Sequence, residues 1–318
     1  MKRRYAVALA CALALSASAL TAGCGDGGEA GASESKELRV GYQQFASLSL
    51  VKARRAEAPG TAWSLFESGP ALTEGLKAGA IDIGEVGEAP PIFAAAGKID
   101  FKIVATSAPV PKGEAVLVKE KSGFRSFTDL KGKKIGLNKG SNVNWLLVKL
   151  LEANGMTIDD VDVKYLKPAE ARPAFDNDQI DAWIIWDPYF ALAETPGVKV
   201  LVDATGLANN REYVLVSPEA LRTKPEQVRQ FLRTLRETTA WGIANPDERG
   251  RLLSPELKIP LDTTVRAQAR SAQPIRPVDA AIGDEIQEIA DGFTELKLIP
   301  GRVDMKGRID DRFTDVLK

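Results

Sequence analysis

Short apolar strands and helices alternate along the chain from residue 38 onward, and this alternation restricts the fold more than any other feature. Proline at the start of an expected helix and glycine just after its end mark the helix boundaries. Strands that alternate with helices in this way form a mostly parallel sheet with helices packed on it. In the first half, the expected strands and helices follow one another at 38–42, 69–79, 81–84, 90–96 and 101–105.

The same alternation restarts after residue 112, which predicts a second α/β lobe. Apolar stripes near 228–235 and 282–293 indicate that the chain after Pro225 is mainly helical. Single hydrophobic cores stop growing near ~250–300 residues, so a chain of this length suits two lobes. In the second half, strands are expected at 115–118, 133–137, 180–185 and 214–216, and helices at 143–154 and 169–175.

The first 23 residues have the order of an export signal. A basic start at Lys2–Arg4 precedes the uncharged apolar run Ala6–Leu20, and small residues then lead to Cys24. A cysteine in this place resembles a bacterial lipobox, in which the thiol is acylated; an ordinary secretory signal with a chance cysteine is the alternative. We predict a signal peptide at 1–23, lipid on Cys24, and a Gly- and Ser-rich tether at 24–37. The protein is then lipid-anchored at the outer side of the cell membrane.

Composition excludes several classes of function. The chain has 42 basic and 43 acidic residues, three of the basic ones in the predicted signal, so the mature chain carries a formal charge of −4. This balance gives no basis for binding nucleic acid. No later apolar run reaches membrane-spanning length. There is no histidine, and the two cysteines are Cys11 and Cys24, which excludes His-dependent nucleophiles, His-ligated metals and a disulfide in the folded body. We predict no cofactor.

Two segments of the chain match each other in pattern. In both 80–90 and 179–188, Ile-Asp opens a strand, and a carboxylate follows six residues after that Asp, with proline close behind. Ligands of open α/β sheets bind beyond the carboxyl ends of strands, next to helix N-termini. One such loop in each lobe would face a cleft, although α/β folds repeat such units in any case.

Six short segments also occur in a family-specific order. They are Gly41-Tyr42-Gln43-Gln44, Gly87-Glu88-Ala89-Pro90-Pro91-Ile92-Phe93, Leu130-Lys131-Gly132-Lys133-Lys134-Ile135-Gly136, Lys139-Gly140-Ser141, Ala182-Trp183-Ile184-Ile185-Trp186-Asp187-Pro188-Tyr189 and Val303-Asp304. From residue 38 to about 304, the chain resembles the aliphatic sulfonate-binding proteins of ABC importers, relatives of the taurine- and nitrate-binding components. The Trp-Asp-Pro-Tyr and Pro-Pro-Ile-Phe segments are the most specific.

The resemblance implies a type II periplasmic-binding-protein fold, an α/β fold whose two lobes are joined by two crossings and close on ligand as a hinge. On this sequence, lobe I would comprise 38–110 and 217–318, and lobe II 111–216. The crossings would lie near 109–114 and 213–218. The implied partners are a small anionic ligand and the permease of an ABC transporter.

A sulfonate has three acceptor oxygens and no proton to donate, so its site must supply N–H and O–H donors. The first N–H groups of a helix and its dipole provide these. As ligand-binding candidates we take backbone donors near glycines and polar side chains at strand ends and helix starts, which are also ordinary capping and turn residues. They are Gln43, Gln44, Gly87, Ser141, Asn142 and Asn144.

Four further candidates have more than one interpretation. Trp186 offers apolar area for an alkyl or aryl tail, or is a core aromatic residue. Asp187 caps the helix that begins at Pro188 and faces the cleft incidentally. Glu88 stands where the family more often carries Asp; it orients the loop, bridges the lobes or contacts a cationic ligand group such as an amine. Arg211 is a candidate charge partner for an anion, or an exposed surface arginine.

The resemblance leaves two classes of function open. The favoured one is an extracytoplasmic solute-binding lipoprotein that captures a small organic anion, an aliphatic sulfonate above all, for an ABC importer. Taurine, nitrate and a thiamine precursor are alternatives within this class. The other class is a pyrimidine-forming enzyme of thiamine synthesis on the same fold. Those enzymes depend on histidine and clustered cysteine, which the mature chain lacks.

Overall fold

The computed structural model of the chain describes residues 37–44 and 46–318. The predicted signal peptide, Cys24 and nearly all of the predicted tether therefore lie outside the described residues. The described residues form one compact unit. Within the described ranges, no helix has both the length and the apolar character needed to cross a membrane.

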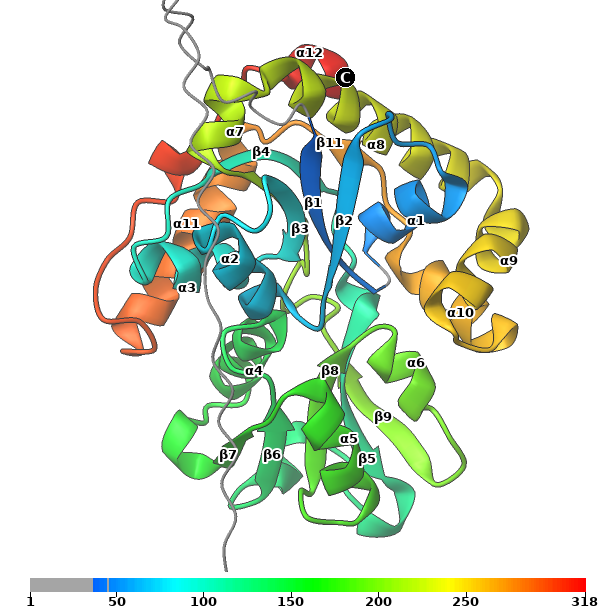
Figure 1. Cartoon of the computed structure of the whole chain (residues 1–318). Coiled ribbons are helices and arrows are strands. Elements are labelled where there is room, and N and C mark those ends of the chain that lie inside the picture. The colour runs from blue at the N-terminus through cyan, green and yellow to red at the C-terminus, as the bar shows by residue number, and fades with distance from the viewer. Residues whose placement is uncertain (1–36, 45) are drawn as a thin grey trace, which may run out of the picture. The chain divides into compact units, whose positions relative to one another are not determined.

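A six-stranded mixed sheet forms one part of this unit, with the strand order β11-β4-β10-β3-β1-β2 (Figure 1). β1 runs parallel to β2 and β3, whereas β10 lies between β3 and β4 and is antiparallel to both. The strands are β1 (Leu38–Gln43), β2 (Thr61–Phe66), β3 (Ile83–Gly87), β4 (Lys102–Ser107), β10 (Glu212–Val216) and β11 (Ile275–Arg276).

A five-stranded mixed sheet forms the other part, with the strand order β7-β6-β8-β5-β9. β6 is parallel to β7 and β8, and β5 is antiparallel to β8 and β9. The predicted α/β class with two sheets is confirmed; the sheets are mixed because β5 and β10 enter from the other sheet and run against their neighbours. The strands are β5 (Glu114–Lys119), β6 (Lys134–Leu137), β7 (Asp162–Tyr165), β8 (Ala182–Trp186) and β9 (Val198–Asp203).

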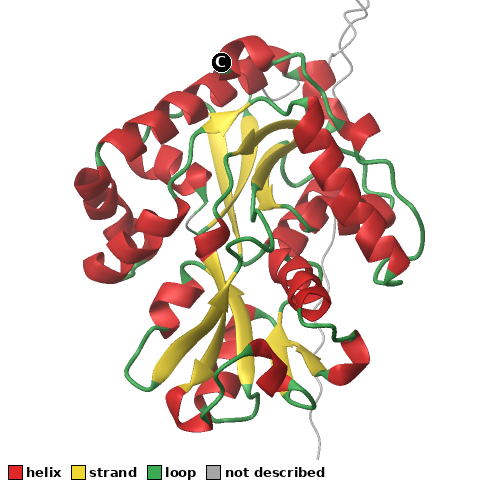
Figure 2. Cartoon of the chain, turned by 180° about the vertical axis from the view of Figure 1, so that it is seen from behind, coloured by secondary structure: helices red, strands yellow, loops and turns green. Residues whose placement is uncertain are grey.

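Helices cover both faces of the sheets (Figure 2). The longest, α8, carries the expected apolar stripe, and Val228, Phe231, Leu232 and Leu235 are buried. The helices are α1 (Ser47–Arg54), α2 (Gly69–Lys77), α3 (Pro90–Ala96), α4 (Asn142–Ala153), α5 (Pro168–Asp176), α6 (Tyr189–Ala193), α7 (Pro218–Thr223), α8 (Pro225–Ala244), α9 (Pro246–Leu257), α10 (Leu261–Ser271), α11 (Ala280–Glu295) and α12 (Thr314–Leu317).

Two segments connect the sheets: residues 108–113 lead from β4 to β5, and residues 204–211 lead from β9 to β10. The first lies where the sequence predicted it. The second was expected at 213–218, with residues up to 216 assigned to lobe II, and this placement is wrong. β10 pairs with β3 and β4 of the six-stranded sheet, so the crossing comes before this strand rather than within and after it.

One apolar cluster contains buried residues of both sheets and of the helices beside them. Its aromatic centre joins three helices: the ring of Phe293 on α11 lies 5.1 Å from that of Phe93 on α3 and 5.5 Å from that of Trp145 on α4 (centroid distances). Trp145 follows β6 of the five-stranded sheet in sequence, whereas Phe93 follows β3 of the six-stranded sheet. Aromatic pairs of this kind add about 0.5–1.5 kcal/mol each beyond their buried area.

Candidate functional site

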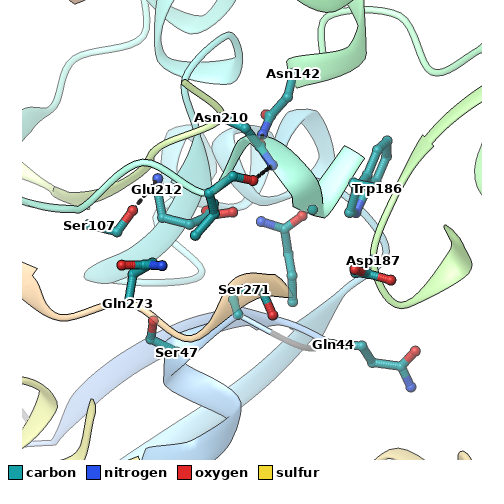
Figure 3. Close-up of a pocket in the computed structure, with 14 residues that line it drawn as sticks. Gln44, Ser47, Ser107, Asn142, Trp186, Asp187, Asn210, Glu212, Ser271 and Gln273 are labelled. Carbon is teal, nitrogen blue, oxygen red and sulfur yellow. Dashed lines mark hydrogen bonds between the residues drawn. The ribbon is translucent and has the colours of Figure 1, made fainter. Parts of the chain in front are cut away.

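An open cavity lies where the two crossings and the strand ends of both sheets meet, and it measures about 610 Å³ when its solvent-filled mouth is included. Its polar side chains surround an open space, with Trp186 and Asp187 on one side and Ser107 and Glu212 on the other (Figure 3). The lining residues are Gln43, Gln44, Ala46, Ser47, Ser107, Val110, Gly113, Asn142, Trp186, Asp187, Asn210, Glu212, Ser271 and Gln273.

Gln43 and Gln44, two of the predicted ligand-binding residues, line this cavity at the end of β1. The Gln43 side-chain Nε2 donates to the backbone oxygen of Glu85 at 3.0 Å, which fixes its amide group beside β3. Ser47 follows at the start of α1 and also lines the cavity. These residues place amide and hydroxyl groups on the side of the six-stranded sheet.

Asn142, at the first turn of α4, links this helix to both crossings at the wall of the cavity. Its Nδ2 donates to Asn210 Oδ1 at 2.5 Å, and Asn210 Nδ2 donates to the backbone oxygen of Val110 at 3.0 Å. Gly87 lies under this amide: a Cβ there would stand only 1.8 Å from Asn142 Oδ1. Gly87 therefore permits a close approach, as predicted, but it is the side chain of Asn142 that it accommodates.

Ser141 and Asn144 do not line the cavity. Both are buried, and each stabilises the turn that leads into α4. Ser141 Oγ donates to the backbone oxygen of Asn138 at 2.7 Å, and Asn144 Oδ1 accepts from the backbone N–H of Gly140 at 2.5 Å. Of the three candidates at this helix start, only Asn142 therefore presents its side chain to the cavity.

Trp186 and Asp187 line the cavity at the end of β8. The ring of Trp186 packs edge-to-face on Tyr189, with 5.9 Å between the centroids. Asp187 Oδ1 accepts from the backbone N–H of Ala191 at 3.0 Å, as expected of a residue that caps α6. Burial raises the pKa of Asp187 above its usual range, and the ion pair with Arg270 opposes this shift.

Arg270, on α10, binds Asp187 through two hydrogen bonds, Nε to Oδ2 at 2.8 Å and Nη2 to Oδ1 at 2.9 Å. Its guanidinium also donates to both carboxylate oxygens of Glu194, each at 3.0 Å. Asp187 and Glu194 flank α6, beside the five-stranded sheet, whereas α10 follows α9 on the other part of the molecule. The ion pair therefore connects the two parts at the edge of the cavity.

Arg211 and Glu88 lie outside the cavity lining. Arg211 is buried, so the interpretation as an exposed arginine is wrong; its Nε donates to Glu285 at 2.9 Å and its Nη1 to the backbone oxygen of Ser107 at 3.0 Å. Glu88 Oε2 accepts from the backbone N–H of Arg211 at 3.3 Å. This bond ties the loop after β3 to the second crossing, in line with a loop-orienting role for Glu88.

Four buried or partly buried glutamates gather around the crossings: Glu85, Glu88, Glu114 and Glu212. Burial raises the pKa of Glu85 to about 7 and that of Glu88 to about 8. Burial and the neighbouring carboxyl groups raise the pKa of Glu114 and of Glu212 well above the usual range. Of the four, only Glu212 lines the cavity. Within the described residues, no cluster of carboxylates, histidines or cysteines could hold a metal ion.

Sequence reasoning missed six polar residues of the lining. Asn210 belongs to the second crossing, and Glu212 begins β10. They were missed because the sequence predicted this crossing too far along the chain, at 213–218. Ser107 ends β4, and its polar character directly after an apolar strand was the signal that could have found it. Ser47, Ser271 and Gln273 lie near helix ends that no motif marked.

Comparisons with known proteins agree with this architecture. The family described as NMT1/THI5 like matches residues 72–249. The alkanesulfonate-binding protein SsuA from Xanthomonas axonopodis pv. citri, solved bound to MOPS, is 33% identical; the match covers 87% of this chain and 98% of that one, with a TM-score of 0.83. The periplasmic aliphatic sulphonate binding protein SsuA from Escherichia coli is 34% identical, with coverages of 87% and 92% and a TM-score of 0.78.

A more distant likeness reaches an enzyme. The desulfurization enzyme DSZB is 15% identical, with a TM-score of 0.62 over 88% of this chain and 98% of that one, and this likeness concerns the fold alone. The family match covers more than half of the chain, and the two SsuA structures match nearly their whole length. The chain belongs to the NMT1/THI5-like family and has the fold of the two sulfonate-binding SsuA structures.

Proposed function

We propose that this protein captures a small organic sulfonate outside the cytoplasm and presents it to the permease of an ABC importer. The observation that carries the proposal is the cavity at the crossings, which is lined by many amide and hydroxyl side chains and by the ring of Trp186. Neutral donors suit a permanent anion with three acceptor oxygens, and an aromatic ring suits an apolar tail. The relatives named as sulfonate-binding proteins support the same class of ligand.

The geometry also supports a hinge mechanism. Asn142 and Trp186 reach the cavity from elements of the five-stranded sheet, and Gln43 and Gln273 reach it from the other part of the molecule. A ligand held by both sets would favour the closed arrangement, with the crossings at 108–113 and 204–211 bending.

Binding of a short-chain sulfonate should stabilise the protein. At ~100 times its dissociation constant, a ligand that binds only the folded state adds about 2.7 kcal/mol to the free energy of unfolding. We expect this as a clear rise in thermal midpoint with linear alkanesulfonates, together with a smaller radius of gyration by small-angle scattering. Sugars serve as negative controls. A rise with nitrate or a pyrimidine and none with any sulfonate would reassign the ligand.

The lipid anchor is part of the proposal and rests on the small residues before Cys24. Expressed in a bacterial host, the full chain should incorporate labelled palmitate and remain with the membrane fraction. The variant Cys24→Ala should incorporate none and should be recovered free of the membrane, while Cys11→Ala, the matched control, should behave as wild type. Equal labelling of Cys24→Ala and wild type would disprove the anchor without affecting the ligand.

An enzyme on this fold is the second class of function considered from the sequence. The two SsuA relatives are binding proteins, and the likeness to DSZB is too distant to carry its activity over. The whole chain has no histidine, and its two cysteines lie at residues 11 and 24, ahead of the folded body. The cavity therefore lacks the nucleophile and the general base that the thiamine-pyrimidine enzymes use.

A further inference from the structure

A second pocket, which we call the side pocket, opens next to the cavity between α1, α8, α9 and α10 (Figure 1). It measures about 330 Å³ when its solvent-filled mouth is included. Four residues line both the cavity and the side pocket: Ala46, Ser47, Ser271 and Gln273 (Figure 3). The two spaces thus adjoin, within reach of one small elongated ligand.

Arg249, on α9, supplies the charge of the side pocket. It is the one charged residue among the eleven that line this pocket, all of which lie in the described ranges. Arg249 is only 5% exposed. Its Nη2 donates to the backbone oxygen of Gln268 at 3.0 Å, whereas its Nε is buried without a hydrogen-bond partner. Among the described residues, no carboxylate forms an ion pair with it.

The lack of a counter-ion sets Arg249 apart from the other arginines near the cavity. Arg211 binds Glu285, and Arg270 binds Asp187. Burial lowers the pKa of Arg249 from its usual value, yet a guanidinium stays protonated in proteins. A buried charge without a partner is costly. The Arg249 guanidinium therefore requires an anion that the described part of the chain does not provide.

The packing of α8 against α9 holds the Arg249 side chain at the side pocket. Gly242 on α8 leaves room for it, because a Cβ there would stand 3.1 Å from Arg249 Cδ. The side-chain amides of Gln268 and Gln273 also line the pocket, and neither forms a hydrogen bond with the described residues. Guanidinium and amide N–H groups are donors to the oxygens of a carboxylate or sulfonate, and a guanidinium can bind two such oxygens at once.

A structural role is the alternative for Arg249. The backbone oxygen of Gln268 belongs to the last turn of α10, where carbonyl groups lack partners within the helix, so the bond from Arg249 ties α9 to the end of α10. That oxygen also accepts from the backbone N–H of Ala272 at 3.2 Å. The bond uses Nη2 and leaves Nε and the positive charge unpaired. A structural role thus explains the position of Arg249 but not its charge.

We propose that the side pocket is an oxyanion subsite, in which the Arg249 guanidinium binds a second acid group of the sulfonate ligand. The inference rests on the proposed function and narrows its ligand to a small sulfonate with an acid group at each end. The sulfonate lies at the neutral donors of the cavity, and the second group, a carboxylate or another sulfonate, lies at Arg249. Asp187 and Glu212, the carboxylates of the cavity, do not line the side pocket where this second group is held.

Three pairs of matched ligands test this in the unmodified protein. Isothermal titration calorimetry should compare 3-sulfopropanoate, 4-sulfobutanoate and 5-sulfopentanoate with 3-methylbutane-1-sulfonate, 4-methylpentane-1-sulfonate and 5-methylhexane-1-sulfonate, respectively. Within each pair, an uncharged isopropyl group replaces the carboxylate. We expect the dianion of at least one pair to bind roughly tenfold more tightly than its partner, or better, as is typical of a hydrogen bond to a charged group.

The outcomes separate the inference from the proposed function. If the branched alkanesulfonates bind and no dianion binds more tightly than its partner, the inference is overturned and the proposed function stands. Binding of none of the six ligands overturns the proposed function, and the inference with it. Where a preference is found, the chain length that shows it most strongly gives the span from the donors of the cavity to Arg249.

The variant Arg249→Gln tests the residue itself, because it removes the charge but keeps an N–H donor for the Gln268 oxygen. It should abolish the preference for the dianion and leave binding of the branched alkanesulfonate unchanged. Arg249→Lys keeps a charge without the paired donors, so it should show a reduced preference, and it provides the test if the glutamine variant does not fold. Arg251→Met, at an exposed position of α9, is the matched control and should keep the full preference. An unchanged ratio of the two affinities in Arg249→Gln or Arg249→Lys overturns the assignment to Arg249.

A free anion from solution is the other source of an acid group at Arg249. In that case, acetate alone should raise the thermal midpoint of the wild type but not of Arg249→Gln, and the matched ligands should bind equally well. That combination overturns the assignment of the side pocket to the ligand. A preference for the dianion that weakens in excess acetate supports the assignment, because both carboxylates then compete for one guanidinium.

Discussion

Replacing Glu88 with glutamine should leave stability near pH 5 unchanged and make the protein more stable than wild type at about pH 9. Glu88 is fully buried, and burial raises the pKa of its carboxyl group to about 8. Only one of its oxygens has a hydrogen-bond partner, so glutamine reproduces the neutral form closely.

The direction follows from the protons bound in each state. Between the unfolded pKa of Glu88, about 4.5, and its folded pKa, the native protein holds a proton that the unfolded chain has lost. The free energy of unfolding therefore falls as pH rises through this window, by about 1.4 kcal/mol per unit, on the order of 5 kcal/mol in total. Glutamine cannot ionise, so the difference between variant and wild type should grow with pH.

Urea unfolding at several pH values measures this difference. Because many groups titrate over the range, the informative quantity is the variant minus the wild type at each pH. Glu226→Gln, at an exposed position of α8, is the control and should follow the wild-type curve. Curves for Glu88→Gln and wild type that stay parallel throughout would show that Glu88 is already ionised in the folded protein.

The second large effect concerns Arg270. Replacing it with methionine leaves Asp187 and Glu194 without their cation, and the Asp187 side chain is only 3% exposed. Removing one partner of a buried ion pair costs about 3–5 kcal/mol, because the other charge stays buried. We expect a loss of this size in urea unfolding, together with weaker ligand binding, since Asp187 lines the cavity.

Arg266→Met is the matched control on the same helix. Arg266 also approaches Glu194, at 3.7 Å, but its side chain is 43% exposed, and exposed pairs contribute about 0–1 kcal/mol. A similar small loss in both variants would mean that solvent replaces the Arg270 contacts without cost and that the pair does not connect the two parts of the molecule.

Much of the fold could be predicted from proline, glycine and apolar periodicity. α3 begins at Pro90, as expected, because proline fits the first turn of a helix, where its missing N–H is not needed. α4 begins one residue before the expected position, and its leucines are buried as its apolar stripe predicted. These local signals depend only on neighbouring residues.

The course of the chain between the sheets could not be predicted in the same way. The apolar run of β10 fits the interior of either sheet, and nothing local states which strands it joins. β2 was missed for a related reason: it lies at the edge of its sheet, and its side chains are partly or wholly exposed, so no continuous apolar run marks it.

The residues of the site likewise divide into those that local sequence could predict and those that it could not. Gln43, Gln44, Asn142, Trp186 and Asp187 were found because they follow strands or begin helices within the recognised segments. Ser271 and Gln273 lie at and just after the end of α10, which packs against α6 and α9, and such tertiary contacts leave no local signal in the sequence. Ser141 was predicted because it precedes a helix, but this position does not determine whether its hydroxyl group points outward or back to the preceding turn.

Two of the contacts that join the parts of the molecule differ in chemistry and lie on different flanks: the rings of Trp145 and Phe293 between α4 and α11, and Arg270 between α10 and α6 (Figure 1). Dissolved ions weaken attraction between charges that water can reach, whereas sulfate and similar anions strengthen apolar association. The buried Arg270–Asp187 pair is largely shielded from dissolved ions, so sulfate acts mainly on the aromatic flank. The kind of salt in the surroundings thus affects one flank more than the other.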